Sequence, residues 1–447
     1  MINDALAFRR SIIVIFVVLL ALNGFAQTDT VSSKPKPLMR DFMGVNGHTV
    51  NFRPELYRKV CRLVRDYHPM DWDTGDDTSY GLDFPFARNR VDWSHVYGSW
   101  KESGFKTDAC VMFETHSSDA WSDLPRDAHQ YGKRFAESFG PLSTALVESI
   151  EIGNEPGKYS DQSYRLVFEN MAKGIRLGDA KVKIATCNVN VGPSGDYHKS
   201  VDCVKGLESL YDVLNVHSYA MLKEWPTWKR SYPEDPDLPS FTSDIDELLQ
   251  WRDQHAPDKE VWLTEFGWDC STQLPKPEGT FAKWEGNTDQ QQAQWLVRSF
   301  FLFATRDIDR AYIFFFNDED MPQLHGASGL TRNYVPKPSF YAVSHLYRTL
   351  GDYRFKQIVQ HSNKNVLIYR FEHETDASKV IYVAWSPTGS GKQATVDFKL
   401  SELRLGHAEK MPFTDQPAER VAVTQRDQIA TVTVDESPAY IFLQQQK

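Results

Sequence analysis

The sequence lacks the signatures of several protein classes. No Gly-x-Gly-x-x-Gly follows the first strand-like run and no His-x-x-Glu-His cluster occurs, so we expect neither a dinucleotide cofactor nor a catalytic metal. The five cysteines are scattered without a Cys-x-x-Cys pair, which argues against a zinc site. Cys187 and Cys203 could form a disulfide or remain buried thiols. The net charge of −10 and the absence of a basic stripe argue against nucleic acid as a partner.

The N-terminus contains the longest apolar run, and this run is short. Arg9 and Arg10 precede eleven apolar residues, Ile12–Leu22, whereas a membrane-spanning helix needs about twenty. Small residues at Gly24 and Ala26 predict a signal peptide over residues 1–26, cleaved after Ala26. The alternative is an uncleaved anchor. We expect a secreted or periplasmic protein, with no integral membrane segment after cleavage.

Residues 41–352 alternate short apolar runs with helix-like segments. Eight runs predict strands: Phe42–Asn46, Arg65–Trp72, Lys106–Phe113, Ser149–Gly153, Lys183–Val189, Val213–His217, Val261–Glu265 and Ala311–Phe316. Helix-like segments lie at Pro54–Val64, Asp92–Ser103, Asp127–Thr144, Ser160–Leu177, Ser200–Tyr211, Thr242–His255, Asp289–Thr305 and Lys337–Thr349. Eight βα units predict a closed (β/α)8 barrel, an α/β fold of the TIM type. The alternative is an open, doubly wound sheet.

Residues 353–447 have a different pattern. Six short alternating runs predict strands without helices between them: Val366–Phe371, Val380–Ser386, Ala394–Leu400, Val421–Thr424, Ala430–Val434 and Ala439–Leu443. Such a series is typical of a small antiparallel β-sandwich. Residues 27–40 are expected to form a linker or an edge strand of that sandwich.

Two glutamates at strand ends are the most informative feature. Glu155 lies in Gly-Asn-Glu-Pro after the fourth run, and Glu265 lies in Leu-Thr-Glu-Phe-Gly-Trp at the end of the seventh, 110 residues later. Active sites of such barrels lie at the C-terminal ends of the strands, so both side chains should lie at the same end of the barrel. Two carboxylates are the minimum apparatus for cleaving a glycosidic bond. The alternatives are a helix N-terminal acid for Glu155 and a structural acid for Glu265.

On these motifs the chain resembles the clan A glycoside hydrolases, which are retaining (β/α)8 enzymes. It looks most similar to family 39, which adds a C-terminal β-sandwich; Gly-Asn-Glu-Pro, Thr-Glu-Phe-Gly-Trp and Pro336-Lys337-Pro338-Ser339 carry that narrower resemblance. The resemblance implies that Glu155 is the acid/base, that Glu265 is the nucleophile, and that Asn154 contacts the sugar 2-hydroxyl.

Polar and aromatic residues at other strand ends are candidates for substrate binding. They are Asn46 and His48 after the first run, Trp72 and Asp73 after the second, His116 in Glu114-Thr115-His116 after the third, His217 and Tyr219 after the sixth, and Phe316 and Asn317 after the eighth. The resemblance places His217 or Tyr219 near the nucleophile. Many clan members have a tryptophan platform after strand eight, where this sequence offers Phe316. For each residue the alternative is a structural role in the core.

Two loops on the predicted catalytic face mix aromatic and cationic residues. Met221–Ser240 contains Trp225 and Trp228 with three cations, and Gln273–Gly286 contains Trp284 with two lysines. This mixture predicts a carbohydrate-binding cleft, and an anionic carbohydrate is one option. The alternative is an ordinary solvated rim.

The sequence therefore predicts a secreted retaining glycoside hydrolase. Two alternatives stay open: a transglycosylase on the same residues, and a non-catalytic carbohydrate-binding barrel. The second would be expected to lose a catalytic carboxylate, and both are present here.

Overall fold

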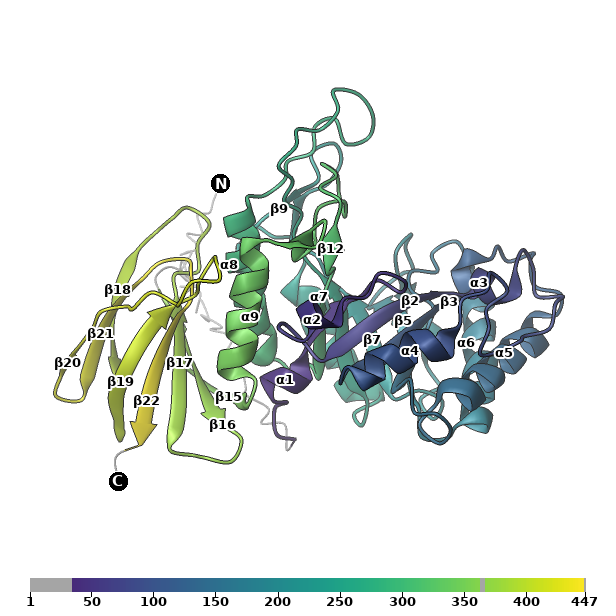
Figure 1. The fold of residues 1–447 in the computed structure, drawn as a ribbon, viewed down its shortest axis with the longest axis horizontal. Coiled ribbons are helices and arrows are strands. Elements are labelled where there is room, and N and C mark those ends of the chain that lie inside the picture. The colour runs from purple at the N-terminus through teal and green to yellow at the C-terminus, as the bar shows by residue number, and fades with distance from the viewer. Residues whose placement is uncertain (1–33, 362–365, 446–447) are drawn as a thin grey trace, which may run out of the picture. The chain divides into compact units, whose positions relative to one another are not determined.

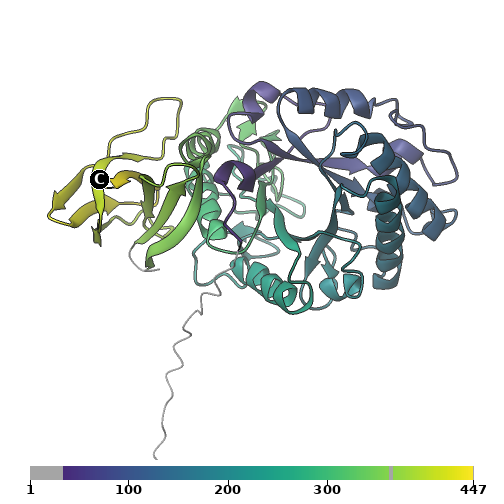
Figure 2. The same cartoon turned by 90° about the horizontal axis from the view of Figure 1, so that it is seen from below.

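The computed structural model describes residues 34–361 and 366–445. Eight parallel strands form its barrel: β1 (Met43–Asn46), β2 (Leu63–Pro69), β3 (Lys106–Met112), β4 (Ser149–Ile152), β5 (Lys183–Asn190), β7 (Val213–His217), β10 (Glu260–Phe266) and β11 (Arg310–Ile313). The hydrogen-bonded order β4-β3-β2-β1-β11-β10-β7-β5 is closed by pairing of β4 with β5. Figure 2 looks along this ring of strands. The predicted (β/α)8 fold is confirmed, and the open sheet is not found.

Six long helices surround the barrel: α4 (Trp93–Glu102), α5 (Leu124–Phe139), α6 (Asp161–Gly178), α7 (Thr242–His255), α8 (Asp289–Ala304) and α9 (Pro338–Leu350). Local chemistry explains where they begin. The Ser160 side chain caps α6, and Thr288 and Gln291 form a capping box at α8. Proline occupies the first turn of α5 and α9, where its missing N–H costs no hydrogen bond.

Two predicted helices are much shorter than expected. The segment 54–64 contains only α2 (Pro54–Tyr57), because β2 begins at Leu63 to pair with β1. The segment 200–211 contains only the 3-10 turn η2 (Val201–Val204), next to the short strand β6 (Lys199–Ser200). Lys205, directly after η2, has an extended backbone (φ −62°, ψ 131°) and ends the turn, and Gly206 follows with a φ of 84°.

Short helices and strands occupy the connections. They are α1 (Met39–Phe42), α3 (Met70–Thr74), the 3-10 turn η1 (Phe113–Thr115), β8 (Met221–Lys223), β9 (Lys229–Arg230), β12 (Asn317–Asp318), β13 (Thr331–Arg332) and β14 (Val335–Pro336). Figure 1 shows the segments after β7 and β10 rising together from one end of the barrel, beside β9 and β12.

The C-terminal part forms two antiparallel sheets. One has the order β15 (Tyr353–His361), β16 (Leu367–His373), β17 (Lys379–Trp385), β22 (Ala439–Gln445), β19 (Leu403–Lys410), and the other β18 (Ala394–Lys399), β21 (Ile429–Val434), β20 (Val423–Arg426). Residues of both sheets share one apolar core. The sequence prediction missed β15 and β19, which are the edge strands of the larger sheet and carry mixed polar residues. Edge strands bury less of each face, so their alternation is weak.

The larger sheet packs its second face on the barrel. The Phe301 ring of α8 lies 5.5 Å from Trp385 and 5.7 Å from Phe371, centroid to centroid. Glu234 accepts a hydrogen bond of 2.7 Å from Trp385 Nε1 and pairs with the buried Arg298. Because side chains alternate across a strand, β16 and β17 contribute to the sandwich core with one set of residues and to the barrel contact with the other.

The predicted signal peptide, residues 1–26, lies outside the described residues. At the start of the described chain, Leu38 makes an isolated antiparallel bridge with Arg354 of β15. No helix within the described ranges has the length and apolar character to cross a membrane. All five cysteines lie in the described part and are buried free thiols, so Cys187 and Cys203 are not bridged.

Candidate active site

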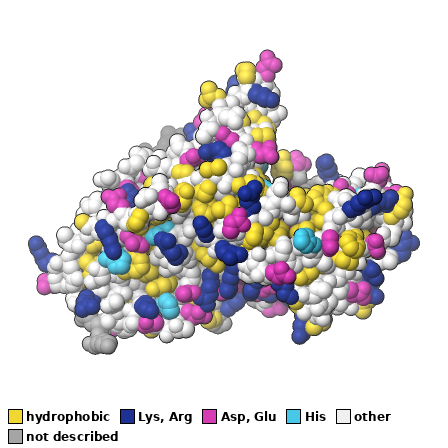
Figure 3. All heavy atoms as spheres, viewed as in Figure 1, with side chains coloured by type: hydrophobic (Ala, Val, Ile, Leu, Met, Phe, Trp, Pro, Cys, Tyr) yellow, Lys and Arg dark blue, Asp and Glu magenta, His cyan; other side chains and the backbone are white. Residues whose placement is uncertain are grey.

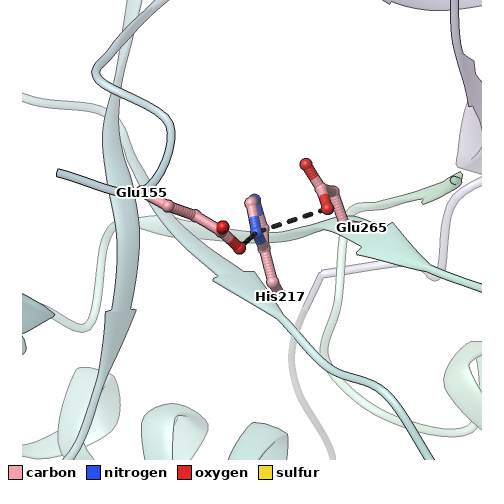
Figure 4. A group of neighbouring side chains, drawn as sticks. All are labelled: Glu155, His217 and Glu265. Carbon is pink, nitrogen blue, oxygen red and sulfur yellow. Dashed lines mark hydrogen bonds and ion pairs between the residues drawn. The ribbon is translucent and has the colours of Figure 1, made fainter. Parts of the chain in front are cut away.

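The two glutamates meet at one end of the barrel. One oxygen of Glu155 and one of Glu265 lie within 4.8 Å of each other, with His217 between them. Nδ1 of His217 lies 2.9 Å from Glu155 Oε1 and 3.6 Å from Glu265 Oε2 (Figure 4). Gly153 turns the chain after β4 with a φ of 84°, and a Cβ there would meet Phe113 at 2.6 Å, so the turn that delivers Glu155 requires glycine.

Glu265 is buried but surrounded by donors. Its Oε1 accepts hydrogen bonds from Tyr67 Oη (2.7 Å) and Arg65 Nη1 (3.1 Å), and its Oε2 accepts one from Tyr219 Oη (2.7 Å). Burial alone would raise the pKa of Glu265, but His217, Arg65 and the two tyrosine hydroxyls outweigh it and lower that pKa to about 2. Glu265 is therefore a carboxylate throughout the physiological range.

Glu155 has a more open environment. Its side chain is 26% exposed, against 6% for Glu265. Among the described side chains, its carboxylate has one hydrogen-bond partner, His217. A carboxyl group that solvent can reach is able to exchange a proton with water, whereas the enclosed Glu265 is shielded from it.

Arg65 organises the floor of the site and was not identified from the sequence. Its guanidinium pairs with Glu151 through two hydrogen bonds of 2.7 and 2.8 Å, and it also donates to Glu265. It further donates to Asn46 Oδ1 (2.9 Å) and Asn154 Oδ1 (2.8 Å). Both Arg65 and Glu151 are fully buried. The sequence placed Arg65 only at the start of a predicted strand, and nothing local showed that it points into the barrel.

The residues predicted after β1 and β11 hold the rim together. Asn46 is buried and its Nδ2 donates to the carbonyls of Thr264 and Ile313. The backbone N–H of Asn317 donates to His48 Nε2 at 3.2 Å, and the His48 ring lies 5.3 Å from Phe315. Asn46 thus ties β1 to β10 and β11, and its contact on β10, Thr264, directly precedes Glu265.

The residues predicted after β2 and β3 lie in another polar cluster. Asp73 accepts hydrogen bonds from His68, Trp93 and Tyr131. The Trp72 ring stacks on Trp93, and His116 contacts Thr74 Oγ1 at 2.7 Å. Within the described residues, Trp72, Asp73 and His116 make no hydrogen bond or ion pair with Glu155 or Glu265. These three side chains stabilise the loop after β2.

The ring of Phe316 faces the core and not the site. It is fully buried and stacks on Tyr57 with centroids 3.5 Å apart. The reason is that β11 ends at Ile313, three residues before the predicted strand end, so Phe316 lies beyond the barrel mouth. Phe314 instead lies beside the site, with its ring 6.5 Å from Tyr67 and 6.3 Å from Tyr219. A sugar platform at Phe316 is therefore ruled out by its burial.

The two aromatic loops pack against each other. Glu285 N donates to Thr227 O at 2.8 Å, Lys229 pairs with Glu285, and the Trp228 ring lies 6.2 Å from Phe281. Trp284 is 7% exposed, whereas Trp225 is 70% exposed. Figure 3 shows apolar and charged side chains mixed on this projection. Of the three predicted tryptophans, Trp225 offers the largest free surface.

Glu155, His217 and Glu265 also have the spacing of a cation site. Their surroundings do not suit one. Both oxygens of Glu265 already accept hydrogen bonds, and the Arg65 guanidinium lies 3.1 Å from one of them. A cation bound to Glu265 would be repelled by the positive charge of Arg65 beside it.

Comparisons with known proteins establish the fold. No protein-family model matches the sequence, and no curated protein matches it. A family 39 glycoside hydrolase from the gut symbiont Bacteroides cellulosilyticus WH2 superposes with a TM-score of 0.66 at 15% identity, over 92% of this chain and 81% of that one. A glucosidase from Croceicoccus marinus gives 0.63 at 14% identity, over 93% and 98%. A family 51 α-L-arabinofuranosidase from Bifidobacterium longum gives 0.59 at 13%, over 92% and 97%.

Proposed function

We propose that this chain is a secreted retaining glycoside hydrolase with Glu155 as the general acid/base and Glu265 as the nucleophile. The observation that carries the proposal is the pairing of an ionised, enclosed carboxylate with a half-open one, their nearest oxygens within 4.8 Å across His217. Retaining glycosidases hold their carboxyl groups about 5–5.5 Å apart, whereas inverting ones need about 6.5–9.5 Å. The likeness in fold to solved glycoside hydrolases supports the same class.

Hydrolysis of the glycosidic bond then proceeds in two displacement steps. In the first, Glu265 attacks the anomeric carbon while Glu155 donates its proton to the leaving oxygen, which gives a glycosyl ester on Glu265 and a free alcohol. In the second, Glu155 removes a proton from water as that water displaces Glu265. Two inversions at one carbon return the original configuration.

The donors around Glu265 suit this role. Tyr67, Tyr219 and Arg65 hold it as an anion before attack, and its oxygen geometry is fixed from three sides. Asn154 uses Oδ1 to accept from Arg65, and no acceptor for its Nδ2 occurs among the described residues. That amide is free to donate to a sugar hydroxyl, the contact expected from its position beside the acid.

The decisive experiment combines product stereochemistry with chemical rescue. We expect NMR of early product to show retained configuration. In Glu155→Ala, aryl glycosides with good leaving groups should still form the intermediate, and azide should release a glycosyl azide of retained configuration. An inverted product would overturn the retaining mechanism. Retained azide product from Glu265→Ala in place of Glu155→Ala would exchange the two roles, and full activity of both variants would overturn the hydrolase function.

A further inference from the structure

Glu114 lies under the peptide that carries the acid/base and has no role in the steps above. It belongs to η1, directly after β3. Its Oε1 accepts hydrogen bonds from the backbone N–H groups of both Asn154 (2.7 Å) and Glu155 (3.0 Å). One carboxylate oxygen thus holds two successive amides of the loop after β4.

The loop has restraints besides Glu114: Arg65 donates to Asn154 Oδ1 (2.8 Å), and Gly157 N donates to Glu155 O (2.8 Å). Gly153 N donates to Val111 O at 2.9 Å, and Asn188 N donates to Asn154 O at 3.1 Å. Both are backbone contacts with neighbouring strands, before the Glu155 amide is reached. The Glu155 side chain itself is fixed only by His217 among the described residues. The direction of the Glu155 carboxyl group therefore depends on where its own backbone is held.

The buried surroundings of Glu114 disfavour the charged form of its carboxyl group. Its Oε2 is buried and has no hydrogen-bond partner within the described residues. Burial raises the pKa of Glu114 to about 7, although the backbone amides of Asn154 and Glu155 pull it down. A buried polar atom without a partner in a native structure calls for a compensating role.

We propose that Glu114 is a positioning residue for Glu155, fixing the Asn154–Glu155 backbone so that the acid/base reaches the glycosidic oxygen. The inference rests on the proposed function, because it assigns Glu155 the proton transfer. Glu114 lies beneath the loop and does not touch the reacting atoms. A displacement of about 1 Å in a catalytic group can lower a rate by about 10²-fold.

Two variants of Glu114 and one control test this. Glu114→Gln keeps a carbonyl oxygen for the two amides, and Glu114→Ala removes the acceptor. Asp108→Asn is the matched control: Asp108 is a buried carboxyl of the barrel whose pKa burial also raises to about 7, and among the described residues it forms no hydrogen bond with Asn154 or Glu155. Two readouts are needed, which are hydrogen exchange of the amides in 152–157 and kcat/KM for glycosides with poor and good leaving groups.

In Glu114→Ala we expect the backbone amides of residues 154 and 155 to exchange hydrogen faster than in the wild type. In Glu114→Gln and Asp108→Asn their exchange rates should match the wild type. On unactivated glycosides, kcat/KM of Glu114→Ala should fall by about 10²-fold. On dinitrophenyl glycosides, which leave without protonation, it should stay within about threefold of the wild type. A general loss of structure would lower kcat/KM equally for both classes of glycoside.

Unchanged exchange in Glu114→Ala, or equal losses on both substrates, would overturn the positioning role. A full loss in Glu114→Gln would also overturn it, since the acceptor remains. If the wild type cleaves no glycoside while exchange at 154 and 155 still accelerates in Glu114→Ala, the proposed function fails, and Glu114 is a structural support of the loop and not a positioning residue for catalysis.

Discussion

The hydroxyl of Tyr219 donates a hydrogen bond of 2.7 Å to Oε2 of Glu265. The donor comes from the segment after β7 and the acceptor from β10, so the parallel pairing of these two neighbouring strands brings them together. A donor to a carboxylate stabilises its charged form, and hydrogen bonds to charged groups contribute about 1.5–3 kcal/mol. This contact is one reason why the pKa of Glu265 is about 2.

Tyr219→Phe should therefore raise the pKa of Glu265. The acid-side fall of kcat/KM reports protonation of the nucleophile, so it should move to higher pH by about one unit. The pH dependence of kcat/KM from pH 2.5 to 7 measures this. Tyr334→Phe is the control, because its hydroxyl donates to Asn51 O, away from the site. If the acid-side fall of kcat/KM stays in place or moves to lower pH in Tyr219→Phe, it does not report the protonation of Glu265.

The same depressed pKa contributes to stability. Because the folded pKa lies below the unfolded value of about 4.3, ionised Glu265 stabilises the fold above that value, and the contribution is lost as pH falls towards about 2. Glu265→Gln removes this dependence. The free energies of unfolding of wild type and variant should therefore converge between about pH 4.5 and pH 2, as followed by urea titrations at each pH.

Glu265→Gln should abolish turnover without unfolding the protein. The amide keeps the volume but cannot attack the anomeric carbon, so kcat should fall by at least about 10⁴-fold. Circular dichroism at neutral pH should match the wild type. Residual turnover within tenfold of the wild type would show that another group is the nucleophile.

The buried pair of Arg65 and Glu151 should be far more sensitive to substitution than an ion pair at the surface. Glu151→Gln removes the negative charge that lies closest to the buried Arg65 guanidinium. Breaking such a buried ion pair lowers the free energy of unfolding by about 3–5 kcal/mol. Glu169→Gln is the control, since its pair with Lys173 is solvent-exposed and should cost under about 0.5 kcal/mol. Chemical denaturation compares them. Equal costs for the two variants would refute the claim.

EDTA should leave activity unchanged. The positive charge of Arg65 beside Glu265 opposes a second cation, and the two carboxylates supply the chemistry without a Lewis acid. Activity before and after dialysis against EDTA, with thermal unfolding followed in parallel, is the measurement. Loss of activity that a divalent ion restores, with an unchanged unfolding temperature, would disagree with this expectation.

Trp225→Ala should weaken binding of long substrates only. The ring is 70% exposed on the projection above the site, so its removal should raise KM for a polysaccharide several-fold and leave stability unaltered. Trp284→Ala, at 7% exposure, should instead destabilise the protein by about 3 kcal/mol or more. Kinetics on polymer and aryl glycoside, together with denaturation, separate the two effects.

Much of the barrel could be predicted from the sequence because its strands are buried on both faces. Most of these strands are short apolar runs that end in polar residues, so the eight strands and the position of Glu155 and Glu265 at two of their ends follow from local pattern, although β2 also carries Arg65, Asp66 and His68. The helix predicted over 200–211 is wrong because the backbone turns extended at Lys205, which the local apolar pattern does not show. The edge strands β15 and β19 were missed because each buries little of its surface.

The surroundings of the two glutamates were decided by tertiary structure alone. Arg65 and Glu265 are 200 residues apart, and only barrel closure places the guanidinium 3.1 Å from the carboxylate. Which alternate residues of a strand point inward depends on register, strand tilt and where the strand stops, as the buried Phe316 shows. The sequence by itself thus determined the fold class and the two carboxylates, because both depend on short-range pattern. The charge of Glu265 and the support under Glu155 were set by contacts between distant strand ends, which no local pattern encodes.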